Sequence, residues 1–336
     1  MNEVAKAVGL HCSSVSLALR DHPSIPPATR ARVRRAAERV GYRVNPLVSA
    51  LMSYRRSSRN QLSHTTIAYV TSSQPADAWK ESRTMNAQYL GAVEQARLQG
   101  YQVEEHPFYA PGLTPARFNE VLWSRGIVGL VIAPLLNGKD TLPIEWGRFA
   151  AVSVAFSLRT PPIPRVGSDH GPSVRLAVCE CRARGYKRIG LAIQHDVLER
   201  VEGQWLAGYL YEHSYPVALR HPAPLIVDAW HPAEFLAWVR RERPDVIVAG
   251  GNADMLIAWL RKARFKVPEQ IGVVSLDLHS RDGSIAGIDQ SSEEIGASVI
   301  DYLIARLHRN ERGAPARPVR LHVMGEWVDG ATIQNV

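Results

Sequence analysis

The basic side chains of the first sixty residues are the groups in this chain whose type and spacing most clearly favour one kind of chemistry. Residues 1–60 hold eleven Lys or Arg and only three acidic residues, a net charge of +8. The other 276 residues hold 29 basic and 29 acidic residues and are formally neutral. A cationic module on a neutral body is typical of a protein that binds a polyanion. A solvated basic surface would have the same composition, so the pattern within the segment must decide.

Catalytic and metal-binding chemistry has little support elsewhere in the sequence. Three cysteines, Cys12, Cys179 and Cys181, make no disulfide framework in a chain this long, and the last two point away from each other if they share a helix. The histidines include no pair at a recognised metal spacing, and the adjacent His195 and Asp196 are predicted to lie in a loop. No glycine-rich dinucleotide or phosphate loop occurs. We expect no metal, no cofactor and no enzyme, with an α/β enzyme as the least favoured alternative because a fold does not determine function.

The expected compartment follows from two absences in the sequence. The chain shows no charged-then-apolar leader and no run of 18 apolar residues, so neither secretion nor membrane insertion is indicated. Together with the sparse cysteines, this predicts a cytoplasmic protein, associated with the nucleoid if its polyanion is DNA.

The basic segment has the pattern of a helix-turn-helix domain. We predict helices over Asn2–Ala7, Cys12–Leu19 and Ala28–Val40. Gly9 supplies the positive φ of a tight turn between the first two helices, and Pro27 suits the first turn of the third. The residues predicted to be buried are Val15, Ala18, Leu19, Val33, Ala36, Ala37 and Val40. The opposite face of the second helix then displays Cys12, Ser13, Ser16 and Leu17.

The neutral body alternates short apolar runs with helical patterns, which is typical of βα units around parallel sheets. The runs predicted as strands are Ile67–Val70, Tyr101–Val103, Val128–Ala133, Ala150–Val154, Ile189–Ile193, Val246–Ala249 and Ile271–Ser275. The helical patterns between them include Tyr89–Leu98 and Pro115–Ser124. About 270 residues are long for one compact unit, so two similar lobes are expected.

Four segments of the N-terminal region, in order and at matching spacing, carry a family resemblance. They are Glu3-Val-Ala-Lys-Ala-Val-Gly-Leu10, Ser14-Val-Ser-Leu-Ala-Leu-Arg20, Thr29-Arg-Ala-Arg-Val33 and Ala37-Glu-Arg-Val-Gly-Tyr-Arg-Val-Asn-Pro46. This pattern resembles the DNA-binding domain of the LacI/GalR family of bacterial transcription regulators. The resemblance implies a helix-turn-helix domain over residues 1–44, a hinge helix and linker over 45–64, and an effector-binding and dimerisation domain over 65–336.

The resemblance implies that the second helix enters the major groove of DNA and reads base edges from its N-terminal turn. Cys12 and Ser13 occupy the adjacent positions that choose the operator half-site in the family, and Leu17 stands where Arg is common. These departures remove the bidentate side chains that discriminate bases best, so DNA shape is expected to contribute. The implied contacts from this helix are His11, Cys12, Ser13, Ser14, Ser16, Leu17 and Arg20.

The segment from Asn45 to Arg56 resembles the family's hinge helix, which folds when two copies meet over the centre of the operator. Leu51 falls on the position of the leucine that wedges into the minor groove and kinks the duplex. The implied hinge contacts are Asn45, Leu47, Ser49, Leu51 and Arg55. The alternative is an ordinary linker helix whose apolar residues pack on the body.

The body resembles the periplasmic-binding-protein fold that the family uses as its effector domain. Its chain crosses between the lobes three times, which we expect near residues 161–165, 287–291 and 319–321. The N-lobe then comprises about 65–162 and 290–320, and the C-lobe about 163–289 and 321–336. A ligand would bind in the cleft between the two lobes.

Five cleft residues follow from the resemblance, position by position. Asp169, Asn252, Asp277 and Gln290 match polar or acidic positions of the family's cleft, and a carboxylate pair suits sugar hydroxyls. Trp205 stands where the family carries a sugar-binding Arg, so its indole either stacks on a sugar face or fills the cleft and excludes ligand. Each of the five has an alternative role as a strand-end or helix-cap polar group.

The sequence thus predicts a homodimeric, sequence-specific DNA-binding transcriptional regulator, with repression favoured over activation. Its partners would be a pseudo-palindromic double-stranded DNA operator and a small-molecule effector, a sugar or a sugar derivative, that acts allosterically. The main alternative is a sugar-binding protein with only nonspecific affinity for nucleic acid.

Overall fold

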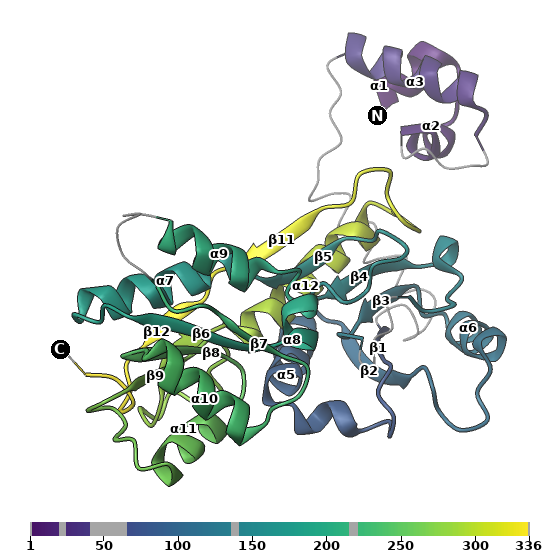
Figure 1. Ribbon diagram of the computed structural model, residues 1–336. Helices are drawn as coiled ribbons and strands as arrows, with labels where there is room; N and C mark the ends of the chain where they lie inside the picture. The colour runs from purple at the N-terminus through teal and green to yellow at the C-terminus, as the bar shows by residue number, and fades with distance from the viewer. Residues whose placement is uncertain (1, 20–24, 41–65, 136–140, 215–220, 335–336) are drawn as a thin grey trace. The chain divides into compact units, whose positions relative to one another are not determined.

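Figure 1 shows the computed structural model, which describes residues 2–19, 25–40, 66–135, 141–214 and 221–334. The chain divides into two compact units, residues 1–61 and 62–336. Within the described residues, no helix combines the length and apolar character needed to cross a membrane.

The first unit is a bundle of three helices, α1 (Asn2–Val8), α2 (Cys12–Leu19) and α3 (Pro27–Arg39). Gly9 adopts φ +64° in the turn between α1 and α2, and Pro27 occupies the first turn of α3. Both features are as predicted, because only glycine takes a left-handed turn at no steric cost and proline needs no N–H at a helix start.

The core of this small unit confirms most of the predicted buried face. Val4, Val15, Ala18, Val33, Ala36 and Ala37 are buried together. The prediction for Val40 is wrong: its side chain is 40% exposed, because α3 ends at Arg39 and Val40 is only the C-cap. Leu19 and Cys12 are both half-buried and pack against the core, so Cys12 is not simply on the outward face.

The second unit contains two lobes, each built on a six-stranded sheet. The N-lobe sheet has the order β11-β5-β4-β3-β1-β2 and all its strand pairs are parallel. Its strands are β1 (Thr66–Thr71), β2 (Gln102–Pro107), β3 (Gly129–Ile132), β4 (Ala150–Val154), β5 (Arg165–Ser168) and β11 (Arg320–Val323). Helices α5 (Arg83–Leu98) and α12 (Ser292–His308) cover one face, and α6 (Pro115–Ser124) covers the other. Short 3₁₀ turns lie at Ala78–Glu81 and Trp146–Arg148.

The C-lobe sheet has the order β12-β10-β9-β8-β6-β7, and only β12 runs antiparallel to its neighbour. Its strands are β6 (Ile189–Gln194), β7 (Leu225–Val227), β8 (Val246–Gly250), β9 (Gly272–Ser275), β10 (Ala286–Asp289) and β12 (Glu326–Val328). Its helices are α7 (His170–Ala183), α8 (His195–Arg200), α9 (Gln204–His213), α10 (Pro232–Glu242) and α11 (Ala253–Lys262). The predicted loop at His195 and Asp196 is wrong, because α8 begins there.

The seven apolar runs predicted as strands all fall on strands of these two sheets, which confirms parallel βα architecture with buried strands. The crossings between lobes differ in position from those predicted. The first lies at Asp169 and the third at residues 324–325, a few residues later than expected, because β5 and β11 pair with each other inside the N-lobe sheet. The second crossing lies at residues 290–291, between β10 and α12.

Candidate functional sites

The N-terminal turn of α2 is the first candidate site, and His11 organises it. The His11 carbonyl accepts the backbone N–H of Val15 at 3.1 Å, and its Nδ1 accepts the backbone N–H of Ser13 at 3.3 Å. His11 therefore acts as the N-cap of the helix, a role usually filled by Ser, Thr, Asp or Asn. The Ser13 hydroxyl lies 2.8 Å from the same nitrogen. His11 and Ser13 are both exposed, so the capped turn is available to a partner.

The rest of the predicted DNA-contacting set on α2 is less exposed. Cys12, Ser14, Ser16 and Leu17 are half-buried, with Cys12 against the core of the unit. The helix carries no charged side chain between Cys12 and Leu19. The remaining predicted contacts lie outside the described residues: Arg20, Asn45, Leu47, Ser49, Leu51 and Arg55.

The second candidate site lies at the carboxyl ends of the C-lobe strands. Asn252 follows β8 and Asp277 follows β9, so parallel neighbouring strands bring both to one edge of the sheet. They line one pocket of about 510 Å³, together with Arg83 from the N-lobe. Asn252 holds φ +56° at the start of α11, a left-handed conformation that Asn tolerates better than most residues. Asp254 and Asp282 add two further carboxylates to the lining.

A hydrogen bond joins the two lobes at this pocket. The Thr84 hydroxyl, at the start of α5 in the N-lobe, donates to the Asp277 carboxylate at 3.1 Å from Oδ1. The Ser275 hydroxyl accepts the Asp277 backbone N–H at 3.2 Å. Burial raises the pKa of Asp277, and nearby His279 and the Thr84 hydrogen bond oppose that rise. Ionisation of the Asp277 carboxyl group is therefore less favourable in the folded protein than in water.

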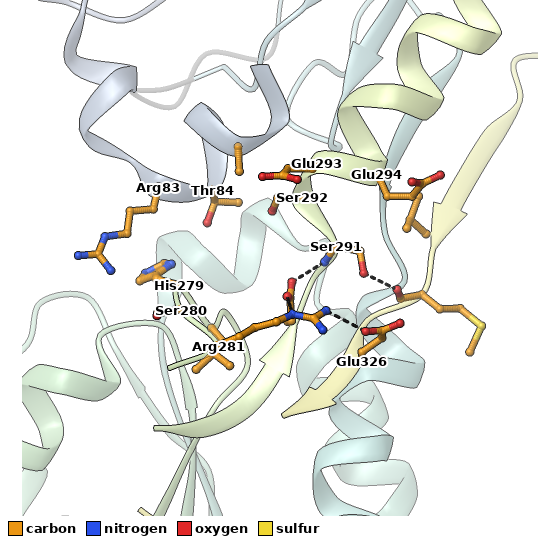
Figure 2. A pocket seen from close by; sticks show the side chains of 15 residues that line it. Arg83, Thr84, His279, Ser280, Arg281, Ser291, Ser292, Glu293, Glu294 and Glu326 are labelled. Carbon is orange, nitrogen blue, oxygen red and sulfur yellow. Dashed lines mark hydrogen bonds and ion pairs between the residues drawn. The ribbon is translucent and has the colours of Figure 1, made fainter. Parts of the chain in front are cut away.

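A second pocket of about 700 Å³ adjoins the first, and the two share Arg83, Leu278, His279 and Ser280. Figure 2 shows Arg83 and Thr84 on its α5 side and the Arg281–Glu326 pair on the opposite side. Arg281 donates to Glu326 at 2.8 Å and also to Asp289. Asp289 in turn accepts the backbone N–H of Ser291 at 2.8 Å. This wall is held by its own ion pairs, and the side chains of Arg83 and His279 line the pocket on its other side.

Comparison with known proteins agrees with the two-part organisation. The model of the lacI family of bacterial regulatory proteins matches residues 1–45, and that of the periplasmic binding protein-like domain matches residues 178–333. Residues 1–45 therefore belong to the LacI family of DNA-binding domains. No curated protein matches this chain significantly over its sequence.

Solved structures share the fold of this protein. A transcriptional regulator CelR–cellobiose complex is 20% identical with a TM-score of 0.64, and covers 98% of each chain. The lac repressor dimer bound to operator and the anti-inducer ONPF is 19% identical with a TM-score of 0.58, and covers 98% of this chain and 97% of that chain. The transcription regulator CcpA of Lactococcus lactis is 14% identical with a TM-score of 0.58, and covers 81% of this chain and all of that chain. At these identities the likeness concerns the fold.

Three of the five cleft residues predicted from the LacI-family resemblance lie away from the two pockets. Gln290 is buried and its Nε2 donates to the Leu276 carbonyl at 2.5 Å, which braces the second crossing. Asp169 starts α7, where its carbonyl accepts the Ser173 hydroxyl at 2.7 Å and its carboxylate lies 3.9 Å from Nδ1 of His322. Neither residue lines the pockets that contain Asn252 and Asp277.

Trp205 is 3% exposed and belongs to the core of the C-lobe. Its ring packs edge-on against His170, with centroids 5.1 Å apart. His170 in turn contacts Phe156 of the N-lobe at 6.2 Å, and Phe156 stacks on His322 at 5.3 Å. Trp205, His170, Phe156 and His322 thus form an aromatic cluster that spans the two lobes.

An ion pair crosses between the lobes beside this cluster. Glu202 of the C-lobe accepts from Arg320 of the N-lobe, with Arg320 Nη2 at 3.1 Å from Oε1, and lies 3.8 Å from Arg165. The sequence pattern missed Glu202, Phe156 and the Arg83–Thr84 pair, because no local spacing connects residues that are more than a hundred positions apart. Among the described residues, no group of His, Cys, Asp and Glu has the arrangement of a metal site.

Proposed function

We propose that this LacI-family protein is a sequence-specific DNA-binding transcriptional repressor whose DNA binding responds to a small molecule held between the lobes of its second unit. The observation that carries this proposal is the combination, in one chain, of a helix-turn-helix unit matching the lacI model and a two-lobed unit with a polar pocket to which both lobes contribute. Neither part alone implies regulation, but together they allow one equilibrium to connect a ligand with DNA.

On the DNA side, the capped N-terminal turn of α2 would enter the major groove and present His11 and Ser13 to base edges. The half-buried Ser14, Ser16 and Leu17 would make shorter contacts from the same helix. Arg20 and the hinge residues Asn45, Leu47, Ser49, Leu51 and Arg55 complete the proposed interface. The lac repressor structure is described as a dimer bound to operator. By analogy, this protein would act as a homodimer on a pseudo-palindrome, with the hinge bending its centre.

On the effector side, the pocket suits a polyhydroxylated ligand. Carboxylates accept two directed hydrogen bonds each, and Asp254, Asp277 and Asp282 line the pocket with Asn252. CelR is described in complex with cellobiose, which supports a sugar or sugar derivative as the ligand class. Asp169 and Gln290 lie outside this pocket, and Gln290 would act indirectly by holding the second crossing through its hydrogen bond to the Leu276 carbonyl. Trp205 would fill the space of the family's Arg rather than stack on a ligand, since it is already buried.

The ligand would act by changing lobe closure. Thr84 and Asp277 already join the lobes, so a sugar hydroxyl that competes for the Asp277 carboxylate alters the same contact. A ligand shifts such an equilibrium only by its differential affinity for the two arrangements, and DNA must then change the affinity for ligand by the same factor. We also propose that the protein catalyses no reaction, needs no cofactor and acts in the cytoplasm on nucleoid DNA.

The decisive experiment is an in vitro selection of randomised duplexes on the full-length protein at near-physiological salt. Enrichment of a pseudo-palindrome around a flexible central step is the expected result. If no sequence is enriched and binding simply vanishes as salt rises, the protein is a ligand-binding body with a nonspecific basic segment, and the regulator proposal fails.

A further inference from the structure

The outward face of α3 carries an unusual row of arginines. Arg32, Arg35 and Arg39 are exposed and lie at i, i+3 and i+7, so they share one side of the helix. The buried side, with Val33 and Ala36, packs against α1 and α2. The arginine row therefore lies on the exposed side of α3, outside its contacts with α1 and α2. Together with Glu38, the three arginines line one shallow hollow in the surface.

These arginines differ from most arginines of the body in having no described partner. Arg97 pairs with Glu94 at 2.7 Å, and Arg184 and Arg309 also have carboxylates beside them. In the described part of the chain, no hydrogen bond or ion pair engages Arg32, Arg35 or Arg39. Like charges three and four positions apart destabilise a helix by about 0.2–0.5 kcal/mol per pair. The row therefore destabilises α3 in the free protein, and a bound polyanion would remove the repulsion between its arginines.

The composition of α2 indicates why the α3 arginines matter for binding DNA. Duplex DNA is bound largely through its phosphates, and Lys and Arg supply that part of the affinity. The reading helix has no charged residue, so it contributes base contacts without electrostatic attraction. The attraction has to come from other elements, and α3 is the described helix of this unit with the largest number of exposed arginines.

We propose that Arg32, Arg35 and Arg39 form a phosphate-binding surface for duplex DNA, separate from the reading turn of α2. The row rises roughly 10 Å along the helix axis, a length over which one strand of the duplex presents about four phosphates, at about 3.4 Å each along its axis, so each of the three guanidinium groups can reach a phosphate. The surface supplies sequence-independent affinity, while α2 supplies selectivity. This inference rests on the proposed DNA-binding function and assigns its electrostatic part.

The test compares full-length protein with the triple variant Arg32→Gln, Arg35→Gln, Arg39→Gln. Fluorescence anisotropy measures affinity for a random-sequence duplex over roughly 50–300 mM salt. Each lost phosphate contact lowers the slope of log K against log salt by about 0.9, so the triple variant loses about 2 to 3 in slope and at least tenfold in affinity at the lowest salt. On an enriched duplex from the selection, the loss is the same factor, because phosphate contacts carry no sequence information.

Two controls separate this surface from net charge and from folding. Lys187→Gln, Arg240→Gln, Lys266→Gln removes three exposed cations from the C-lobe and should leave the slope unchanged. Arg→Lys at the three α3 positions keeps the charge and should keep most of the slope. Circular dichroism should show α3 variants as helical as the parent. An unchanged slope in the Gln variant, or an equal loss in the C-lobe control, overturns the inference.

A further arm identifies which duplex the surface contacts. Protein saturated with a short enriched duplex is offered a second, labelled random duplex at low salt. If the parent captures the second duplex and the Gln variant does not, the surface contacts a separate DNA segment. If neither captures it but the Gln variant still shows the lower salt slope, the surface contacts the flank of the same duplex. If the parent protein binds no duplex at any salt, the proposed function itself fails. If the parent binds duplex DNA in a salt-dependent way and the triple Gln variant binds equally well, only this inference fails.

Discussion

At the scale of single residues, the contacts that join the lobes are made by side chains far apart in the sequence. Thr84 and Asp277 meet across 193 positions, and Glu202 meets Arg320 across 118. Both contacts use polar groups at the ends of strands or helices, where the backbone sets direction. A ligand at this site therefore competes with contacts that the protein already makes with itself.

Asp277→Asn should separate ligand binding from stability. The raised pKa of Asp277 means that this group favours the folded state at acid pH, where it is protonated, and that the contribution is lost as pH rises through the raised pKa. Asparagine keeps an acceptor for Thr84 but cannot ionise. The variant should be at least as stable as the parent at pH 7 and should bind a sugar ligand at least tenfold more weakly, because a charge-assisted hydrogen bond is about twice as strong as a neutral one.

Urea unfolding from pH 4 to 8 and calorimetry with the ligand measure the two properties of Asp277→Asn. Thr84→Val is the matched variant, since it removes the donor and retains the carboxylate. If Asp277→Asn is much less stable than the parent at pH 7, the carboxylate is needed in its charged form and the assignment is wrong.

His170 should make the body sensitive to acid. Burial, with a smaller effect of His322, lowers the pKa of His170 to about 4, so the neutral ring is favoured in the folded state. The associated stability is present above the unfolded-state pKa of His and is lost as pH falls through 6.5 towards 4. His170→Phe should abolish about 3 kcal/mol of that loss, because phenylalanine keeps the contacts with Trp205 and Phe156 and cannot gain a proton.

Urea unfolding of parent and His170→Phe at pH 7, 5.5 and 4 measures this difference. The solvent-exposed His231 provides the control, since His231→Phe removes a titratable ring without changing a buried contact. Parallel stability–pH curves for the parent and His170→Phe would show that His170 takes no part in the acid response.

At the scale of elements, α5 and α12 pack closely against each other in the N-lobe, and glycine makes this close packing possible. A Cβ at Gly91 would lie 2.0 Å from the backbone oxygen of Glu293, and one at Gly296 would lie 2.0 Å from that of Gln88. The two backbones therefore touch, and these helices also carry the residues that begin the pocket wall, Arg83 and Thr84 on α5 and Ser292 on α12. Packing of this pair sets where those side chains reach.

Gly91→Ala and Gly296→Ala should each destabilise the body by about 3 kcal/mol, because the helices must separate to admit a methyl group and lose buried contacts beside it. Gly171→Ala in α7 is the matched control: nothing lies within 4 Å of a Cβ there, so alanine should stabilise the helix by about 0.5–1 kcal/mol. Thermal unfolding followed by circular dichroism compares the three. Equal melting temperatures for Gly91→Ala and Gly171→Ala would contradict the close contact.

At the scale of the whole molecule, charge and fold divide at the same place in the chain. The excess positive charge lies in residues 1–60, and the first compact unit ends at residue 61 of the chain. Each lobe of the second unit has a complete sheet with buried apolar clusters on both faces. The second unit therefore needs nothing from the first for its core.

Removal of residues 1–61 should leave a soluble, folded body with a formal charge near zero, because its sheets and cores are intact. We expect a dimer on size-exclusion chromatography with light scattering, and no measurable affinity for duplex DNA at about 100 mM salt. An insoluble or monomeric product would show that the first unit contributes to the fold or the association of the second. DNA binding by the truncated protein would place a nucleic-acid site on the body.

Local patterns in the sequence predicted many of the helices and strands of this structure. Helix α2 and strand β4 have the predicted bounds, because helical periodicity, short apolar runs and the Gly and Pro signals act over a few residues. The lobe boundaries at residues 161–165 and 319–321 were wrong by a few residues, since the pairing of β5 with β11 joins segments about 155 positions apart. The family resemblance placed Asn252 and Asp277 at one pocket, but also pointed to Trp205, which the structure buries.

By itself, the sequence determined the cationic N-terminal helices, the βα order of the body and the identity of the groups available for binding, because charge, periodicity and turn chemistry are local properties. Only the tertiary structure decided which of those groups meet: Thr84 with Asp277, Arg83 over both pockets, and Trp205 with His170 between the lobes. These contacts depend on how two sheets pack and where the chain crosses between them. No short segment contains that information, since burial and pairing are properties of the whole folded chain.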